Sequence, residues 1–600
     1  MSEKKTSNGA ETIYWDLSDL YTSGEDPNIR KDQHRLRDLA STFAARYRGT
    51  LATAHAGELA EALRTYEEIN DLLGKMGSFA YLQWSTNTEN ISYGQLMQQI
   101  NEFSSELSQQ LVFFDVEWLA LEEERAAELI ADERLKSWKH YLTASRRYKK
   151  HILSEKEEQI LTAKSVTGSQ AWVRYFDETL GAARFELDGE QLTEQEVLSK
   201  MHEPDRELRQ RAADSLTRGF REHRRTLTFI FNTLLADKFT NDTLRKYPSW
   251  ISGRNLSNQI EDDTVETLVE SVLKFYPTVQ RYYKLKKQLL GYDSFFEYDR
   301  YAPLLQTESR VSWSDAQTMV LDAFNGFNPE MGRIARRFFD ENWIDAAIRP
   351  GKRGGAYSAS TVPSVHPYVF MNYDGRLRDV QTLAHELGHG VHQYLSREQG
   401  ILQADTPLTT AETASVFAEM LVFQKLLAEL TDPREKLALL MGKIDDTIAT
   451  VFRQVSMNRF EDAIHTARRH EGELSAERFS ELWRKTQTDL YGDSVQLTEN
   501  YDLWWCYIPH FLHTPGYVYA YAFGELLVLA LYNRYENGAE NFPQRYEQLL
   551  RAGGSDWPEN LVSKLDVDIK DSTFWESGLA IIDQLVDQAE QLSAQAGMGQ

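Results

Sequence analysis

Cysteine is nearly absent from this sequence, with Cys506 the single example in 600 residues. One cysteine excludes an internal disulfide and any metal site built mainly from thiolates. It also favours a reducing compartment, so we expect a cytoplasmic protein. The residues before Ile13 contain no apolar segment of the kind that a secretory signal needs, which agrees with that location.

Long hydrophobic runs and positive charge are also scarce. The longest apolar run, from Val518 to Tyr532, is interrupted by Gly524 and Glu525 and is too short to span a membrane. The chain has 66 lysines and arginines against 91 aspartates and glutamates, which gives a net charge of −25. Because such a surface repels phosphate backbones, we expect no nucleic-acid partner. Because the apolar run is too short, we expect no membrane partner.

What is present is the pattern of a large helical protein. Hydrophobic residues make up 42% of the chain and charged residues 26%, as in folded globular domains. Amphipathic segments at helical spacing fill most of the sequence, which predicts a mainly α fold. Because 600 residues exceed what one hydrophobic core usually supports, we expect two lobes, at residues 1–195 and 196–600.

One stretch is rich in glycine, serine and β-forming residues instead. Residues 351–375 read GKRGGAYSASTVPSVHPYVFMNYDG, which predicts two short strands of a small sheet, Ala356–Ser360 and Tyr368–Tyr373. The edge of such a sheet can pair with the backbone of an extended peptide, with Gly355 and Ala356 as candidate contact points. An ordinary edge strand with a flexible loop is the alternative.

Directly after this stretch comes the motif HExxH, formed by His385, Glu386 and His389. On an α-helix, residues four apart lie on nearly the same face, so both imidazoles can bind one ion. Imidazole nitrogens suit zinc, and we expect one zinc ion per chain. Glu386 adjoins the first ligand, where its carboxylate can accept a proton from water.

The third zinc ligand must come from another segment. His392 lies about 10 Å along the helix from His385, too far to share one ion with it. Of the acids that follow, Glu398 continues the polar face of the same helix and is expected to be solvated. Glu412 and Glu419 are two helical turns apart within an apolar pattern. Two carboxylates there are costly unless they bind something, so we assign Glu412 to the metal.

Two further acids are candidates for supporting roles. Glu419 is expected to orient a ligand imidazole through the other ring nitrogen. Asp379 lies six residues before His385, so it does not face the same way along the helix. It could cap the start of the helix or accept a hydrogen bond from a ligand histidine, and the sequence leaves both open.

A second group of rare residues lies far downstream, in WWCYIPHFLHTPGYVYAYAFGELL. Hydrolysis of a peptide bond builds negative charge on the carbonyl oxygen, and the histidines and tyrosines of this segment can donate hydrogen bonds to it. Tyr517 and Tyr521 share one helix face, whereas Tyr519 points away. Pro515 and Gly516 indicate a bend or hinge just before them.

These motifs together resemble the thimet-oligopeptidase-like metallopeptidases, and most closely their oligoendopeptidase F members. TLAHELGHGVH is followed after 23 residues by ETASVFAE, as in that family. YWDLSDLY, RKYPSWISGRNLSN, GKRGGAYS and IPHFLHTPGYVYAYAFGELL also look like the family and occur in the same order. The resemblance covers nearly the whole chain.

The resemblance implies a two-lobed helical zinc endopeptidase that cleaves short peptides, with the second lobe as the catalytic one. It implies that His510 is the proton-donating histidine and that Tyr517 and Tyr521 bind substrate. His513 stands where the family more often has an aromatic residue, so it stays a second candidate beside His510. It further implies a channel that excludes folded proteins.

Two other functions remain open at this stage. A related zinc carboxypeptidase would need a cation that binds the terminal carboxylate of the substrate. A non-catalytic helical protein that binds peptides would carry an inert HExxH motif. Either a monomer or a homo-oligomer is compatible with the sequence.

Overall fold

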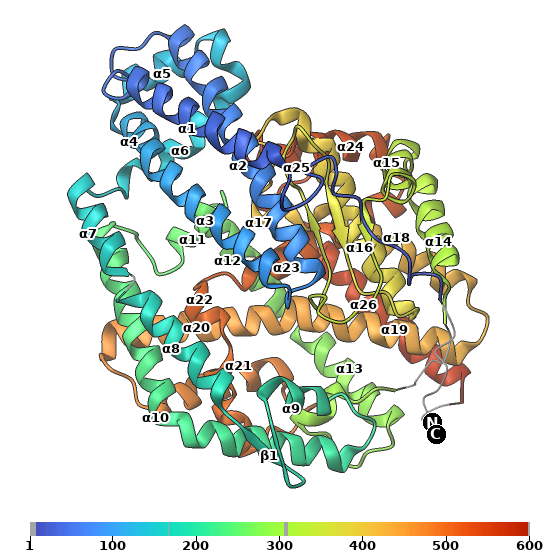
Figure 1. Cartoon of the computed structure of the whole chain (residues 1–600). Coiled ribbons are helices and arrows are strands. Elements are labelled where there is room, and N and C mark those ends of the chain that lie inside the picture. Colours follow the sequence, from blue (N-terminus) through green and yellow to red (C-terminus); the bar gives the residue numbers. More distant parts are fainter. Residues whose placement is uncertain (1–7, 166, 305–309, 598–600) are drawn as a thin grey trace. The chain divides into compact units, whose positions relative to one another are not determined.

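The computed structural model describes residues 8–165, 167–304 and 310–597 (Figure 1). Most of these residues are helical, which confirms the expected mainly α fold. Contacts divide the chain into two compact units. The first unit comprises Met1–Lys149, Glu308–Leu426 and Arg534–Asp568, and the second comprises Lys150–Thr307, Leu427–Asn533 and Ile569–Gln600. The predicted boundary near residue 195 lies within a stretch of the second unit and stays a prediction.

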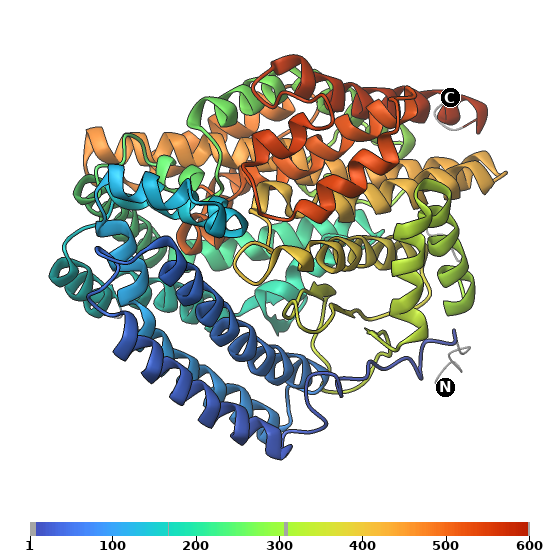
Figure 2. The same ribbon diagram turned by 90° about the horizontal axis from the view of Figure 1, so that it is seen from above.

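The first unit contains the N-terminal helices, a small sheet and the helix of the HExxH motif. Its elements are α1 (Pro27–Tyr47), α2 (Ala56–Thr86), α3 (Ile91–Leu111), α4 (Phe113–Ala120), α5 (Glu123–Ile130), η1 (Glu133–Trp138), α6 (Lys139–Arg146), η2 (Arg147–Lys150), α14 (Trp313–Phe327), α15 (Pro329–Asp340), β3 (Ile344–Asp345), β4 (Tyr357–Ala359), β5 (Tyr368–Phe370), α16 (Leu377–Ser396), η4 (Arg397–Gln399), α17 (Leu408–Ala411), α18 (Thr413–Glu429), α24 (Phe542–Ala552) and α25 (Pro558–Ser563). Figure 2 shows α1, α2 and α3 running alongside one another, and contacts join each of the three to the other two.

The second unit is built around the long helix α10. Its elements are α7 (Glu155–Ser165), α8 (Ser169–Ala182), β1 (Phe185–Leu187), β2 (Glu190–Leu192), α9 (Glu194–Lys200), α10 (Arg206–Leu244), α11 (Ser252–Ser257), α12 (Asp262–Lys274), α13 (Tyr276–Leu289), η3 (Glu297–Tyr301), α19 (Pro433–Thr447), η5 (Ile448–Phe452), α20 (Arg453–Glu471), α21 (Ala476–Tyr491), η6 (Glu499–Tyr507), α22 (His510–His513), α23 (Tyr519–Glu536) and α26 (Ser572–Gln595). One aromatic-rich core joins α10 to α8, β1, α20, α21 and η6.

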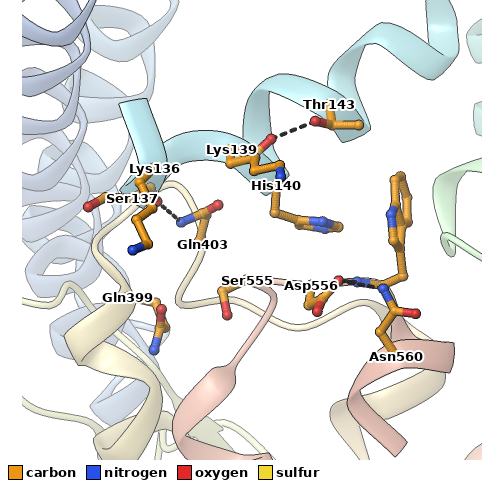
Figure 3. Close-up of a pocket in the computed structure, with 11 residues that line it drawn as sticks. Lys136, Ser137, Lys139, His140, Thr143, Gln399, Gln403, Ser555, Asp556 and Asn560 are labelled. Atoms are coloured by element: carbon orange, nitrogen blue, oxygen red, sulfur yellow. Dashed lines mark hydrogen bonds between the residues drawn. The ribbon is translucent and has the colours of Figure 1, made fainter. Parts of the chain in front are cut away.

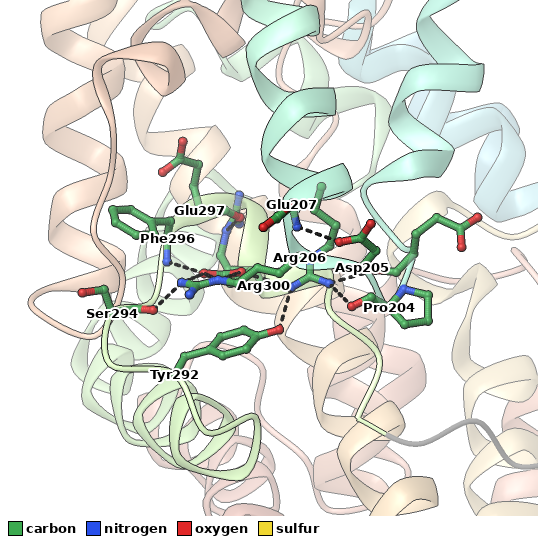
Figure 4. A network of polar contacts seen from close by, with 12 residues as sticks. Pro204, Asp205, Arg206, Glu207, Tyr292, Ser294, Phe296, Glu297 and Arg300 are labelled. Carbon is green, nitrogen blue, oxygen red and sulfur yellow. Dashed lines mark hydrogen bonds and ion pairs between the residues drawn. The ribbon is translucent and has the colours of Figure 1, made fainter. Parts of the chain in front are cut away.

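The start of α10 is fixed by a buried polar network, shown in Figure 4. The carboxylate of Asp299, which is fully buried, accepts hydrogen bonds from Arg206 at 2.8 Å and from Arg209 at 3.1 Å. Arg206 also donates to the carbonyl of Ser294, and Arg209 to the hydroxyl of Tyr292. Because each buried charge is paired and hydrogen-bonded, the network holds α10 against η3 and the segment before it.

The small sheet of the first unit has three strands, in the order β3, β5, β4. β5 pairs with β4 antiparallel and with β3 parallel. The two predicted strands are thus present, although each is three residues long and shorter than expected. β4 lies at one edge of the sheet, and both β4 and β5 contact α16.

Helix α16 is held by a buried apolar face. The side chains of Leu383, Leu387, Val391 and Leu395 are all buried, and their helical spacing places them on one face of α16. α14, α15 and α24 pack against this helix together with the sheet. Among the described helices, none combines the length and the apolar character needed to cross a bilayer.

Candidate functional site

The two histidines and Glu412 come together in the first unit. Oε2 of Glu412 lies 3.4 Å from Nε2 of His385 and 3.4 Å from Nε2 of His389. The three donor atoms lie within 4.8 Å of one another, and no other His, Cys, Asp or Glu group of this kind occurs among the described residues. Helix α16 supplies both imidazoles, and Glu412 lies at the break between α17 and α18.

These separations fit a tetrahedral zinc ion. Zinc holds imidazole nitrogen and carboxylate oxygen at about 2.0–2.2 Å, so two such ligands at the tetrahedral angle lie about 3.4 Å apart. Both measured nitrogen–oxygen separations have that value. Three protein ligands leave a fourth position open, as catalytic zinc sites require. The residues present therefore suit a catalytic metal centre.

A glycine between the two histidines allows Glu412 to approach. A Cβ atom on Gly388 would lie 2.5 Å from the carbonyl oxygen of Ala414 and 2.6 Å from Cα of Ser415. Contacts that short do not occur between real side chains and backbone, so only glycine fits here. Gly388 thus brings the start of α18, and with it Glu412, against α16.

Two hydroxyl groups hold the segment around Glu412. Ser415 donates a hydrogen bond of 2.7 Å to Oε2 of Glu412. Tyr546, on α24, donates a buried hydrogen bond of 2.7 Å to the carbonyl of Thr413. Neither residue was predicted from the sequence. Ser415 is three residues after Glu412, a spacing that brings side chains together on a helix, so the sequence held a signal for it. No local pattern points to Tyr546.

The charges around the site favour bound metal. Nδ1 of His385 lies 3.3 Å from a carboxylate oxygen of Glu419. Burial alone would lower the pKa of His385, but Glu419, Glu412 and Glu386 outweigh it and raise the pKa to about 9. Burial alone would raise the pKa of Glu412, but His389, His385 and Ser415 lower it to about 2. Carboxylates therefore stabilise positive charge at this place.

Glu386 is buried beside the two histidines. Burial raises the pKa of its carboxyl above the ordinary value, and His385 and His389 act in the opposite direction. A hydrogen bond from the backbone of Ser358, on β4, also lowers it. Glu386 thus combines a carboxyl of raised proton affinity with a direct link to the edge strand.

The carboxylate of Asp379 serves the start of α16. Its Oδ2 accepts hydrogen bonds from the backbone N–H groups of Asp374 at 2.9 Å and Arg376 at 3.0 Å. Of the two interpretations left open by the sequence, the geometry favours the helix cap.

The glycine-rich loop leads into the edge strand β4. Gly355 has a φ of +83°, and a Cβ atom placed on it would meet nothing within 4 Å. Its carbonyl accepts a hydrogen bond of 3.0 Å from Asn372. Ala356 is the next residue and directly precedes β4. A turn with this backbone and this free space allows another chain to come close.

His510, Tyr517 and Tyr521 form one cluster in the second unit. Nε2 of His510 and the hydroxyl of Tyr521 are 3.3 Å apart. The ring of Tyr517 lies 5.0 Å from that of Tyr521 and 6.1 Å from that of His510, measured between centroids. Burial lowers the pKa of His510, and the nearby His513 adds to this effect. The cluster offers two hydroxyl groups and one imidazole.

His513 is turned to a different partner. Its Nε2 lies 2.8 Å from a carboxylate oxygen of Asp177, and its ring meets Phe176 edge to face. Of the two histidines, His510 is therefore the one grouped with Tyr517 and Tyr521.

Tyr519 points away from this cluster. It is fully buried, and its hydroxyl accepts a hydrogen bond of 2.9 Å from Asn258.

A polar cavity of about 540 Å³ lies in the first unit and contains none of these residues (Figure 3). It is lined by Lys136, Ser137, Lys139, His140, Thr143, Gln399, Gln403, Ser555, Asp556, Trp557 and Asn560. Gln403 donates to the carbonyl of Ser137 and accepts from the N–H of Tyr141. These bonds fix the segment that connects α16 to Glu412.

Comparison with known proteins identifies the family of the chain. The model of peptidase family M3 matches residues 199–581, and the model described as oligopeptidase F matches residues 117–185. The chain is 28% identical over 588 residues to oligopeptidase PepF of Bacillus subtilis, which covers 96% of this chain and 87% of the relative. It is 26% identical over 594 residues to an oligoendopeptidase F homolog of Lactococcus lactis, with 97% of both chains covered.

Solved structures share the fold. The structure of oligoendopeptidase-F from Enterococcus faecium superposes with a TM-score of 0.72 at 23% identity, over 95% of this chain and 99% of that chain. A peptidase structure from Chlamydophila abortus gives a TM-score of 0.85 at 25% identity, over 97% of this chain and 98% of that chain.

Proposed function

The chain belongs to peptidase family M3, and from this membership we propose that it is a zinc-dependent endopeptidase that hydrolyses internal bonds of short, unstructured peptides. One observation carries the proposal. Two imidazole nitrogens on one helix and a carboxylate oxygen from another segment lie at the separation of 3.4 Å that zinc ligands have.

His385, His389 and Glu412 would hold the ion. When bound, zinc lowers the pKa of the attacking water to about 7 and polarises the carbonyl of the scissile bond. Glu419 keeps the His385 ring oriented through Nδ1. Ser415 keeps the Glu412 carboxylate oriented in the same way.

Glu386 is the general base in this proposal. Its carboxylate takes a proton from water as the water oxygen attacks the carbonyl carbon, and then delivers that proton to the nitrogen of the departing segment. A raised pKa suits the first step, because a carboxyl with higher proton affinity accepts the proton more readily.

The remaining site residues would handle the substrate. We assign to His510 and Tyr517 the donation of hydrogen bonds to the carbonyl oxygen as it gains negative charge, each contributing about 10²–10³ in rate. Tyr521 would bind the substrate beside them. His513, whose ring nitrogen lies 2.8 Å from a carboxylate oxygen of Asp177, is a further candidate for substrate binding. Gly355, Ala356 and the edge of β4 would pair with the backbone of the peptide, so binding tolerates different side chains.

The preference for short peptides rests on the relatives, which are named oligopeptidases and oligoendopeptidases. We expect the enzyme to act in the cytoplasm, where the single, buried cysteine stays reduced. A bradykinin-sized peptide should be cleaved rapidly and a native folded protein slowly. Fast degradation of a folded protein would show that the size limit is wrong.

Zinc stoichiometry tests the proposal directly. Purified protein should contain one zinc ion per chain, lose activity on chelation and regain it when one equivalent of zinc is returned. Protein that cleaves peptides unchanged in excess chelator would contradict the zinc dependence. Protein that binds no metal and cleaves no peptide would support a non-catalytic peptide-binding function instead.

Amidated substrates separate the proposal from a carboxypeptidase. A carboxypeptidase binds the terminal carboxylate of its substrate, whereas an endopeptidase does not need it. The enzyme should cleave a peptide and its C-terminal amide at similar rates, at the same internal bond. Removal of single C-terminal residues, abolished by the amide, would identify a carboxypeptidase.

A further inference from the structure

Glu461, on α20, is a fully buried carboxyl that the proposed mechanism does not use. Its Oε1 accepts a buried hydrogen bond of 2.9 Å from the backbone N–H of Gly516. Its Oε2 has no hydrogen-bond partner among the described residues. Burying a carboxyl with one oxygen unpaired costs free energy, so the group calls for a reason other than stability.

The backbone that Glu461 holds is a tightly packed turn. Gly516 has a φ of +75°, and a Cβ atom on it would lie 3.3 Å from Cβ of Arg254 and 3.3 Å from Cγ1 of Ile251. The carbonyl of Pro515 accepts a hydrogen bond of 3.4 Å from Nε of Arg254. Glu461 and Arg254 thus both form hydrogen bonds with the backbone of this turn, at the N–H of Gly516 and the carbonyl of Pro515.

The same face of α20 is anchored by two further contacts. Asp462 accepts a hydrogen bond of 2.8 Å from Nε1 of Trp250, and the ring of His465 stacks on Trp250 with centroids 4.6 Å apart. A Cβ atom on Gly516 would also lie 3.4 Å from Trp250. Trp250 thus connects α20 to the same turn that Glu461 contacts.

Tyr517 follows Gly516 directly. The direction of the Tyr517 side chain depends on the peptide that Glu461 holds, because the backbone N–H of Gly516 lies one residue before it. The ring of Tyr517 packs edge to face on Tyr521 and faces His510. A turn free to rotate would let the ring leave both partners.

We propose that Glu461 is a positioning residue, whose carboxyl holds the N–H of Gly516 and so fixes the Tyr517 ring against His510 and Tyr521. The proposal rests on the role of Tyr517 in the proposed function. This role requires an acceptor oxygen within hydrogen-bonding distance of the N–H of Gly516. It does not require a charge on Glu461.

The protonation state of Glu461 agrees with a role that does not depend on charge. Burial raises the pKa of Glu461 to about 8, although the N–H of Gly516 and the charges of Lys238 and Arg254 act to lower it. The carboxyl is thus mostly neutral at pH 7 and still accepts the hydrogen bond. A neutral amide of the same length should therefore replace it.

Two conservative variants separate the effect of the length of the Glu461 side chain from the effect of its charge. Glu461→Gln keeps an acceptor at the same distance and removes the charge. Glu461→Asp keeps the carboxyl but withdraws it by about 1.5 Å, beyond hydrogen-bonding distance of the N–H. We expect the glutamine variant to keep kcat within threefold of the wild type and the aspartate variant to lose about tenfold, with KM nearly unchanged.

Thr466→Ala, at an exposed position of the same helix, is the matched control and should leave kcat unchanged. Melting temperature and zinc content are measured for every variant. An aspartate variant with wild-type kcat would overturn the proposal, as would a glutamine variant that is equally impaired. A loss of kcat that only follows lost zinc or lost folded protein would also overturn it.

A fluorotyrosine label at position 517 reports on the ring itself. Its ¹⁹F signal should shift or broaden in Glu461→Asp and not in Glu461→Gln. In a Tyr517→Phe background, Glu461→Asp should add little further loss, whereas a full additional tenfold loss would contradict coupling. If Tyr517→Phe is fully active, the assigned role of Tyr517 fails, and the ¹⁹F signal still decides whether Glu461 positions the ring.

Discussion

The carboxylate of Glu419 lies 3.3 Å from Nδ1 of His385, on the opposite side of the ring from the nitrogen that faces Glu412. A carboxylate at the second ring nitrogen fixes the tautomer and the orientation of a metal-binding imidazole. α18 begins directly after Glu412 and also carries Glu419, so one helix places both acids around the same histidine.

Glu419→Gln should weaken zinc binding. The amide keeps the shape of the side chain but loses the charge that raises the basicity of His385, so we expect the dissociation constant to rise about tenfold. Competition with a chelating dye measures it. Glu435→Gln, at an exposed position of α19, serves as the control and should bind zinc like the wild type. Equal affinities for all three proteins would exclude the orienting role.

Gly388→Ala should disrupt the junction between α16 and α18. The added methyl group would lie 2.5 Å from the carbonyl of Ala414, so the two helices must separate and Glu412 must move. We expect a loss of about 1–3 kcal/mol in stability together with weaker zinc binding. Melting temperature and zinc affinity are the measurements.

Gly442→Ala is the matched control for that variant. Gly442 lies within α19, and a Cβ atom placed on it meets nothing within 4 Å. Because alanine favours helix over glycine by about 0.5–1 kcal/mol, this change should be neutral or stabilising. If both alanine variants behave alike, close packing at Gly388 is not what the metal centre needs.

The pH dependence of stability should reveal Glu461. Its pKa of about 8 in the folded chain lies above the ordinary value of 4.5, because burial outweighs Gly516, Lys238 and Arg254. The folded state therefore binds the proton more tightly, and this contribution to stability is full below pH 4.5 and is lost as pH rises through about 8. Between pH 6 and pH 9 the melting temperature should fall further in the wild type than in Glu461→Gln. Parallel curves would contradict the burial of the charge.

Tyr517→Phe should slow catalysis without unfolding the protein. It removes only the hydroxyl that we assign to the carbonyl oxygen, so kcat should fall about 10²-fold with little change in KM. Tyr519→Phe removes a neighbouring hydroxyl that bonds to Asn258 instead. It should cost about 1 kcal/mol of stability and leave kcat unchanged. The opposite pattern would mean that the roles of the two tyrosines are exchanged.

Local patterns in the sequence predicted much of this fold. The apolar positions from Leu383 to Leu395 follow helical spacing because one face of α16 packs on the core, and all four are buried. The strand β3, Ile344–Asp345, was missed, because two residues carry no periodicity and depend on β5 for their pairing.

The candidate site was predictable where its residues are close in sequence. Spacing alone placed His385 and His389 on one helix face, and two turns separate Glu412 from Glu419. The expected single helix through both acids is interrupted at Glu412. The contact of Tyr546 with Thr413 joins segments 133 residues apart, and the link from Ser358 to Glu386 joins a strand to a helix. Such contacts arise only from tertiary packing, so no local sequence pattern predicts them.

The most direct test is Glu386→Gln, measured for zinc content and peptide cleavage in the same preparation. Glu386 is adjacent to a ligand without being one, so the variant should keep one zinc ion per chain. Without the carboxylate that accepts the proton from water, kcat should fall by about 10²–10⁴-fold. A variant that retains zinc and cleaves peptides at the wild-type rate would contradict the account.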